Sequence, residues 1–106
     1  MSSQTPGYTY IWEYTVWPEH AADFEQAYGP NGAWVALFKR ARGYLRTELH
    51  RDRNVPNRYV TIDYWGSLAA WQAFRAAFSA EFEAIDAQCG SFTQEEREVG
   101  RFTPLA

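Results

Sequence analysis

Large hydrophobic residues alternate with polar ones in three short segments, and a period of two is typical of strands that are buried on one side. The segments are residues 8–16, 44–51 and 58–65. A polar loop of turn-forming residues at 52–57 joins the last two, which predicts a hairpin. Residues 92–102 show a weaker strand pattern, and their polar centre predicts a place at the edge of the sheet.

Between these strands, apolar residues recur every three or four positions, which is the spacing of amphipathic helices. The spacing predicts helices over residues 19–28 and 33–41, separated by a Gly-Pro-Asn-Gly breaker, and one long helix over residues 68–88. Ser67 is a candidate N-cap of the long helix. Merging the two short helices gives the order βαββαβ. We therefore expect an α+β, ferredoxin-like sandwich with helices on one face of an antiparallel sheet.

The length of 106 residues is that of a single domain. We expect a flexible tail at 1–7 and one domain at 8–106. Aromatic residues make up 18% of the chain, more than a small core needs, and this surplus predicts a ligand cavity, a buried interface or both. Both strand faces carry large side chains, so the pattern leaves open which face the helices cover. Large aromatics on the other face would need a second copy of the chain to cover them.

Charge and residue usage exclude several classes of function. The net charge of −3, with acidic residues among the basic ones, disfavours nucleic-acid binding. The longest apolar run, residues 33–38, is too short to span a bilayer, so we expect no membrane partner. Residues 1–7 lack the apolar segment of a signal peptide, and the single cysteine forms no disulfide framework, which favours a cytoplasmic location. One cysteine and two histidines do not make a structural zinc site.

Two groups of residues are candidates for chemistry. His50 and Glu48 share a face of the second strand, and Asp63 lies on the third strand, which pairs with the second through the hairpin. A histidine beside carboxylates can act as a general base near pH 7. The alternative is an exposed histidine in a salt-bridged strand pair.

Aromatic side chains on the strands and the long helix form the second group. They suit a pocket for a flat ring, and a plain packed core is the alternative. The candidate pocket residues are Trp12, Tyr14, Trp65, Trp71, Phe74 and Phe78.

Several short motifs, in this order and spacing, resemble the antibiotic biosynthesis monooxygenase domain family over residues 8–102. They are Val16-x-Pro18-Glu19, Gly43-Tyr44-Leu45-x-x-Glu48-Leu49 and Tyr59-Val60-Thr61-Ile62-x-x-Trp65-x-Ser67. The resemblance implies a dimeric α+β barrel, in which two protomers place their sheets face to face. It also implies a pocket between sheet and helices. There, some members oxidise polycyclic phenols or quinols with O₂ and use neither metal nor flavin.

The resemblance also implies roles for single residues. Trp65 matches the tryptophan that ends the third strand of the family, and Trp71 stands where the phenol oxidases have a tyrosine. Thr61 replaces an asparagine of those enzymes.

We therefore expect a homodimeric, cofactor-independent monooxygenase for an aromatic, quinol-like or polyketide-like molecule. In this hypothesis His50, helped by Glu48 or Asp63, accepts a proton, and Tyr14 donates a hydrogen bond to a substrate oxygen. The alternatives are a non-catalytic dimeric protein that binds small ligands or acts as an accessory, and an isomerase or cyclase of the same barrel class.

Overall fold

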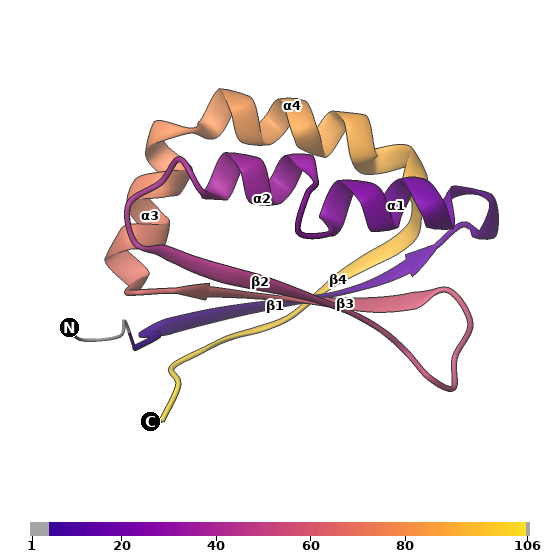
Figure 1. Ribbon diagram of the computed structural model, residues 1–106, viewed down its shortest axis with the longest axis horizontal. Coiled ribbons are helices and arrows are strands. Elements are labelled where there is room, and N and C mark those ends of the chain that lie inside the picture. Colours follow the sequence, from indigo (N-terminus) through magenta and orange to yellow (C-terminus); the bar gives the residue numbers. More distant parts are fainter. Residues whose placement is uncertain (1–4, 106) are drawn as a thin grey trace.

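A four-stranded antiparallel sheet carries helices on one of its faces in the computed structural model, which describes residues 5–105 (Figure 1). The strands lie in the order β2-β3-β1-β4. Their bounds are β1 Tyr8–Val16, β2 Tyr44–Arg51, β3 Arg58–Trp65 and β4 Thr93–Phe102. The first three strands begin and end at the predicted residues, and the polar β4 lies at the predicted edge. The ferredoxin-like α+β fold is confirmed.

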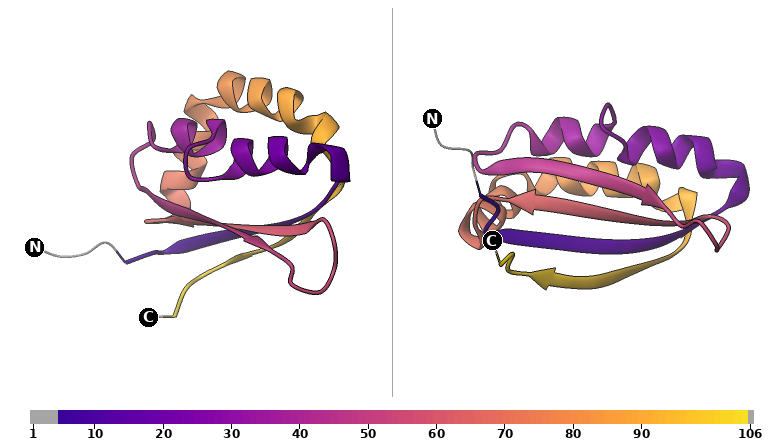
Figure 2. Two further views of the ribbon diagram at one scale, coloured as in Figure 1. Left: turned by 45° about the vertical axis from the view of Figure 1, so that its right-hand side comes forward. Right: turned by 60° about the horizontal axis from the view of Figure 1, so that its bottom comes forward.

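The helices form a single layer over the sheet, as both further views show (Figure 2). The first crossover begins with a 3-10 turn at Pro18–His20 and continues through α1 and α2. The second crossover contains α3 and α4 and ends in a 3-10 turn at Gly90–Phe92. The helix bounds are α1 Ala21–Tyr28, α2 Ala33–Phe38, α3 Leu68–Ala77 and α4 Ser79–Cys89.

The long helix predicted over residues 68–88 is in fact two helices. At Phe78 the backbone leaves the helical region, with φ −114° and ψ 27°, although neither glycine nor proline is present. Phe78 N still donates to the carbonyl of Phe74 at 2.9 Å, and Phe82 N donates to the carbonyl of Phe78 at 2.8 Å. The bend lets α3 pack on the end of β3 while α4 packs against α2 (Figure 1). The predicted cap is confirmed, because Ser67 Oγ accepts from Ala70 N at 3.0 Å.

The aromatic side chains of β1 point toward the helices. We call this side of the sheet the inner face and the opposite side the outer face. Opposite residues of an antiparallel pair share a face, and Tyr14 of β1 lies opposite Tyr59 of β3. The outer face instead carries branched aliphatic residues such as Ile11, Val60 and Ile62, which are half-buried. Most aromatic side chains of the strands therefore face the helices, contrary to the expectation that the other face carries the large aromatics; Tyr64 and Phe102, which both lie opposite Thr9, are on the outer face.

The most deeply buried aromatic side chains lie where β3 meets α3 and where β1 meets α1. Trp65 and Phe24 have no exposed surface, and Phe74 is 2% exposed. The Trp65 ring lies 5.2 Å from that of Phe74. These side chains anchor the helices on the sheet and set the space left between them.

The two chain ends lie partly outside the described residues. Residues 1–4 of the predicted tail at 1–7 lie outside the described residues, as does residue 106. Gly7 N already donates to the carbonyl of Trp65 at 2.9 Å. Between residues 5 and 105, no helix is long and apolar enough to cross a membrane.

Candidate functional site

A cavity of about 360 Å³ lies between the inner face and the helices. Its volume falls near the lower end of the ~300 to 1,000 Å³ typical of small-molecule pockets. Rings make up most of the wall, which favours flat apolar ligands. The sheet contributes Tyr10, Trp12 and Tyr14, and the helices contribute Tyr28, Trp34, Phe38, Trp71 and Phe82.

Asp63 is the buried carboxyl group of this cavity. It lies on β3, opposite Thr47 of β2 and Tyr10 of β1, and is only 8% exposed. Within residues 5–105, no cation forms an ion pair with it. Burial raises the pKa of Asp63 to about 6, because the apolar surroundings disfavour the charged form more than one hydrogen bond from Thr47 favours it. Asp63 therefore exchanges a proton close to neutral pH.

A chain of hydroxyl groups holds the Asp63 carboxylate in place. Thr47 Oγ1 donates to Asp63 Oδ1 at 2.7 Å and lies 2.8 Å from the hydroxyl oxygen of Tyr44. Since Thr47 gives its only hydroxyl proton to Asp63, the Tyr44 hydroxyl is the donor to Thr47. The chain leaves Asp63 Oδ2 free of described side-chain partners and available to a ligand.

Tyr14 presents a second polar group in the same wall. Its hydroxyl lies 3.1 Å from Thr61 Oγ1. Burial raises the pKa of Tyr14 well above its ordinary value, so the phenol keeps its proton at neutral pH. Either hydroxyl can be the donor of this pair, and where Thr61 donates to Tyr14 the phenol proton is free for an oxygen of a ligand.

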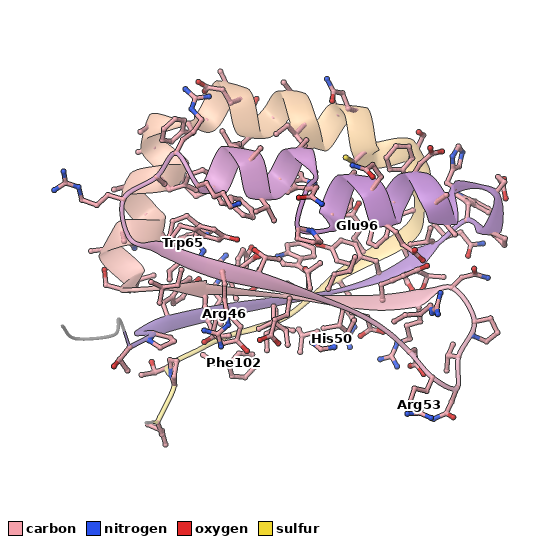
Figure 3. The ribbon with its side chains drawn as sticks, in the orientation of Figure 1. Arg46, His50, Arg53, Trp65, Glu96 and Phe102 are labelled. Carbon is pink, nitrogen blue, oxygen red and sulfur yellow. The ribbon has the colours of Figure 1, made fainter. Side chains whose placement is uncertain are left out.

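The structure separates the predicted pocket residues into two groups. Trp12, Trp71, Tyr14 and Asp63 line the cavity. The other aromatic candidates belong to the packed core and do not line it. Trp65 and Phe74 are buried in the core, and half-buried Phe78 packs against it. The Trp65 ring points to the helix side of the sheet (Figure 3), where it is enclosed by other rings.

His50 and Glu48 lie on the outer face, away from the cavity. His50 is opposite Val60 and Glu48 is opposite Ile62, both outer-face residues, whereas Asp63 points inward. His50 Nε2 lies 3.2 Å from Glu48 Oε1, and this hydrogen bond lowers the pKa of Glu48. His50 projects from the side of the sheet opposite the helices (Figure 3). The register of the hairpin therefore does not bring His50 and Glu48 together with Asp63.

Sequence reasoning missed two arginines of the cavity wall. Arg75 follows Trp71 by one helical turn on α3, and that spacing was the available signal. Arg101, on β4, lies over the rings of Tyr10 and Trp71, with 5.2 and 5.1 Å from Cζ to the ring centroids. Arg101 also pairs with Glu98. The edge strand thus contributes to the cavity.

Metal ligands do not gather here. Across residues 5–105, no three side chains of His, Cys, Asp or Glu lie close enough together to hold a metal ion. The groups able to act on a ligand are the carboxyl, hydroxyl, indole and guanidinium groups described above.

Comparison with known proteins places the chain in a family. Residues 7–88 match the sequence model of the antibiotic biosynthesis monooxygenase family. The chain belongs to this family. No curated protein matches the sequence.

Several solved structures are similar to this protein over nearly its whole length. A putative antibiotic biosynthesis monooxygenase from Bordetella bronchiseptica is 24% identical with a TM-score of 0.72, covering 96% of this chain and 100% of that one. A second one, from Caulobacter crescentus, is 17% identical with a TM-score of 0.73, covering 97% and 93%. A variant of SnoaB, a cofactor-independent oxygenase from Streptomyces nogalater, is 26% identical with a TM-score of 0.64, covering 94% of each chain. The family predicted from the motifs is confirmed.

Proposed function

We propose that this protein is a monooxygenase that oxidises a small aromatic or quinol-like molecule with O₂ and uses neither metal nor flavin. The observation that carries the proposal is a buried carboxyl group, Asp63, in the wall of an aromatic cavity. Membership of the monooxygenase family and the similarity to SnoaB, a cofactor-independent oxygenase, support it. In this proposal Asp63 replaces His50 as the proton acceptor.

The chemistry needs only a base, a dry site and an electron-rich substrate. The Asp63 carboxylate takes a proton from an acidic CH₂ or OH group, and the resulting anion passes one electron to O₂. The substrate radical and superoxide combine at carbon, and Asp63 returns its proton to give a hydroperoxide. Loss of water from the hydroperoxide leaves a carbonyl group. One oxygen atom enters the substrate and the other leaves as water.

Other residues of the cavity orient the reaction. Tyr14 donates a hydrogen bond to an oxygen of the substrate, where negative charge collects after deprotonation. Trp12 and Trp71 hold the ring by stacking, and Thr47 keeps the carboxylate pointing at it.

The test is O₂ uptake with anthrone as substrate and metal-free protein. We expect Asp63→Asn to slow uptake by about a hundredfold or more, because the amide cannot accept the proton. His50→Ala is the matched control, since His50 lies on the outer face, and it should retain the wild-type rate. A slow His50 variant beside an active Asp63 variant would reverse the assignment.

The same measurement separates the alternative functions. Turnover of a carbonyl substrate without O₂ consumption would favour an isomerase or cyclase that uses the same base. Binding of aromatic ligands with no turnover of any would favour a non-catalytic binding protein.

We further propose that the protein is a homodimer through the outer face, as the family resemblance implies. This face carries half-buried Ile11 and Ile62, and Phe102 of β4 is 46% exposed. Phe102 projects on the side away from the helices (Figure 3). A second sheet would cover this apolar surface. Sedimentation should give a dimer for the wild type and a monomer for Ile62→Glu, whereas a wild-type monomer would contradict the proposal.

A further inference from the structure

The side chain of Arg75 is the most unusual charged group of the cavity. Arg75 lies on α3, one turn after Trp71, and both contribute to the cavity wall. Its guanidinium carbon is 3.9 Å from the centre of the Phe82 ring on α4. A guanidinium stacked on a ring keeps its edges open for hydrogen bonds in the plane of the group. The contact with the Phe82 ring uses none of the N–H groups of Arg75 as donors to a polar partner, so they are left to another group.

No such partner is found in the described part of the chain. Within residues 5–105, Arg75 takes part in no ion pair, and its Nη1 is buried without a hydrogen bond. Arg101, the other cavity arginine, pairs with Glu98 at 3.2 Å. Arg58, near the hairpin, lies between Glu13 and Asp52, at 2.7 Å from each. A half-buried cation among rings ordinarily has a counterion, so its absence here points to a ligand.

The carboxylates that line the cavity do not serve as the counterion of Arg75. Asp63 is on the sheet wall and is held by Thr47. Asp86 and Glu96 are exposed, so water screens their charges. Arg75 is thus the cavity's one cation that no carboxylate within residues 5–105 neutralises.

We propose that the cavity binds an aromatic molecule that carries a carboxylate group, and that Arg75 is the residue that binds this carboxylate. The guanidinium fork matches a carboxylate in a bidentate arrangement, and the ring of the ligand lies against Trp71. Asp63, on the opposite wall, then faces the reacting part of the ligand. The inference rests on the proposal that the cavity is the substrate site, and it narrows the substrate to an aromatic acid.

Binding of two matched probes tests the inference without any turnover. Anthraquinone-2-carboxylate carries the charge, and anthraquinone-2-carboxamide is its neutral counterpart. Quenching of tryptophan fluorescence reports both, because Trp12, Trp34 and Trp71 line the cavity. We expect wild-type protein to prefer the carboxylate by about tenfold or more.

Substitutions of Arg75 test whether its side chain causes the preference for the carboxylate probe. Arg75→Gln should bind both probes equally, with the affinity for the amide unchanged, and Arg75→Lys should keep part of the preference. The matched control is Arg40→Gln, because Arg40 also lies over a phenylalanine ring, Phe78 at 5.0 Å, but does not line the cavity. It should bind like wild type.

Equal affinity of wild type for the two probes, absence of binding to either, or an undiminished preference in Arg75→Gln would overturn the inference. Should Arg75→Gln fail to fold, the salt dependence in wild type decides, since a charge-based preference falls as ionic strength rises. Because neither probe is oxidised, a failure here is distinct from a failure of the O₂-uptake experiment.

Discussion

The pKa of a carboxyl group is shifted in opposite directions on the two faces of the sheet. On the inner face, Asp63 forms no ion pair with a cation of residues 5–105, and burial raises its pKa to about 6. On the outer face, Glu13 accepts hydrogen bonds from Arg58 and Arg97, which lower its pKa to about 2. Desolvation dominates in the first case and hydrogen bonding to guanidinium groups in the second.

The difference assigns different roles to the two faces. A carboxyl group that titrates near neutral pH among rings is suited to proton transfer. A carboxylate that stays ionised between two arginines is suited to holding β1, β3 and β4 in register. The predictions below test this contrast in order of decreasing effect.

The inner face itself contains a packed part and a cavity part, and two tryptophans separate them. Trp65→Ala should lower the free energy of unfolding by about 3 to 5 kcal/mol, because the side chain is fully enclosed. Trp12→Ala should lower the free energy of unfolding clearly less, because half-buried Trp12 borders the open space of the cavity. It should, however, weaken binding of anthraquinone-2-carboxylate. Urea unfolding at fixed protein concentration measures both variants. Equal losses of stability would show that the inner face is one continuous core.

Asp63→Asn should stabilise the protein at alkaline pH. Because the folded-state pKa is raised, protonated Asp63 contributes stability that is present below the ordinary pKa of 3.8 and lost as the pH rises through about 6. The free energy of unfolding of the variant should therefore exceed that of wild type by about 3 kcal/mol above neutral pH and equal it in acid. Urea unfolding across pH measures this, with Asp86→Asn as an exposed control. A variant less stable than wild type above neutral pH would contradict the account of burial.

The rate of O₂ uptake should depend on pH through the ionisation of Asp63. If ionised Asp63 is the base, kcat/KM for anthrone should fall by about tenfold for each pH unit below about 6 and level off above it. Glu13→Gln should keep this profile, because Glu13 is on the outer face. A wild-type rate that is flat between about pH 4 and 7 would exclude Asp63 as the base.

Glu13→Gln should have the smallest effect, on acid stability alone. The lowered pKa of Glu13 contributes stability that is present above its ordinary value of 4.5 and lost as the pH falls through about 2. The gap in melting temperature between wild type and variant should therefore shrink as the pH is lowered over that range. Circular dichroism at several pH values measures it, and a gap that widens in acid would contradict the ion-pair account.

Much of the fold could be predicted because the strand signal is local. Alternation located β1, β2 and β3 to the residue, and the charges of β4 placed it at an edge, where solvent reaches them. The bend at Phe78 carried no such signal. Without glycine or proline, only the packing of α3 on β3 and of α4 on α2 explains it.

The candidate site was predicted less completely than the fold. Trp12, Tyr14, Trp71 and Asp63 were predicted and line the cavity, but Trp65 has the same periodicity and lies in the core. Periodicity indicates which face a side chain occupies and not how deeply the opposite layer covers it. Arg75 and Arg101 were missed because their partners are rings on other elements.

The amino-acid sequence by itself determined the strands, the order of strands and helical segments, the family and the supply of aromatic and carboxyl groups, all of which depend on near neighbours and spacing. The tertiary structure alone decided which sheet face the helices cover and that His50 and Asp63 lie on opposite sides. Both depend on strand register and on contacts between distant segments, and a shift of one residue would exchange every side chain between the faces. That choice of face makes Asp63 a buried group that titrates near neutral pH.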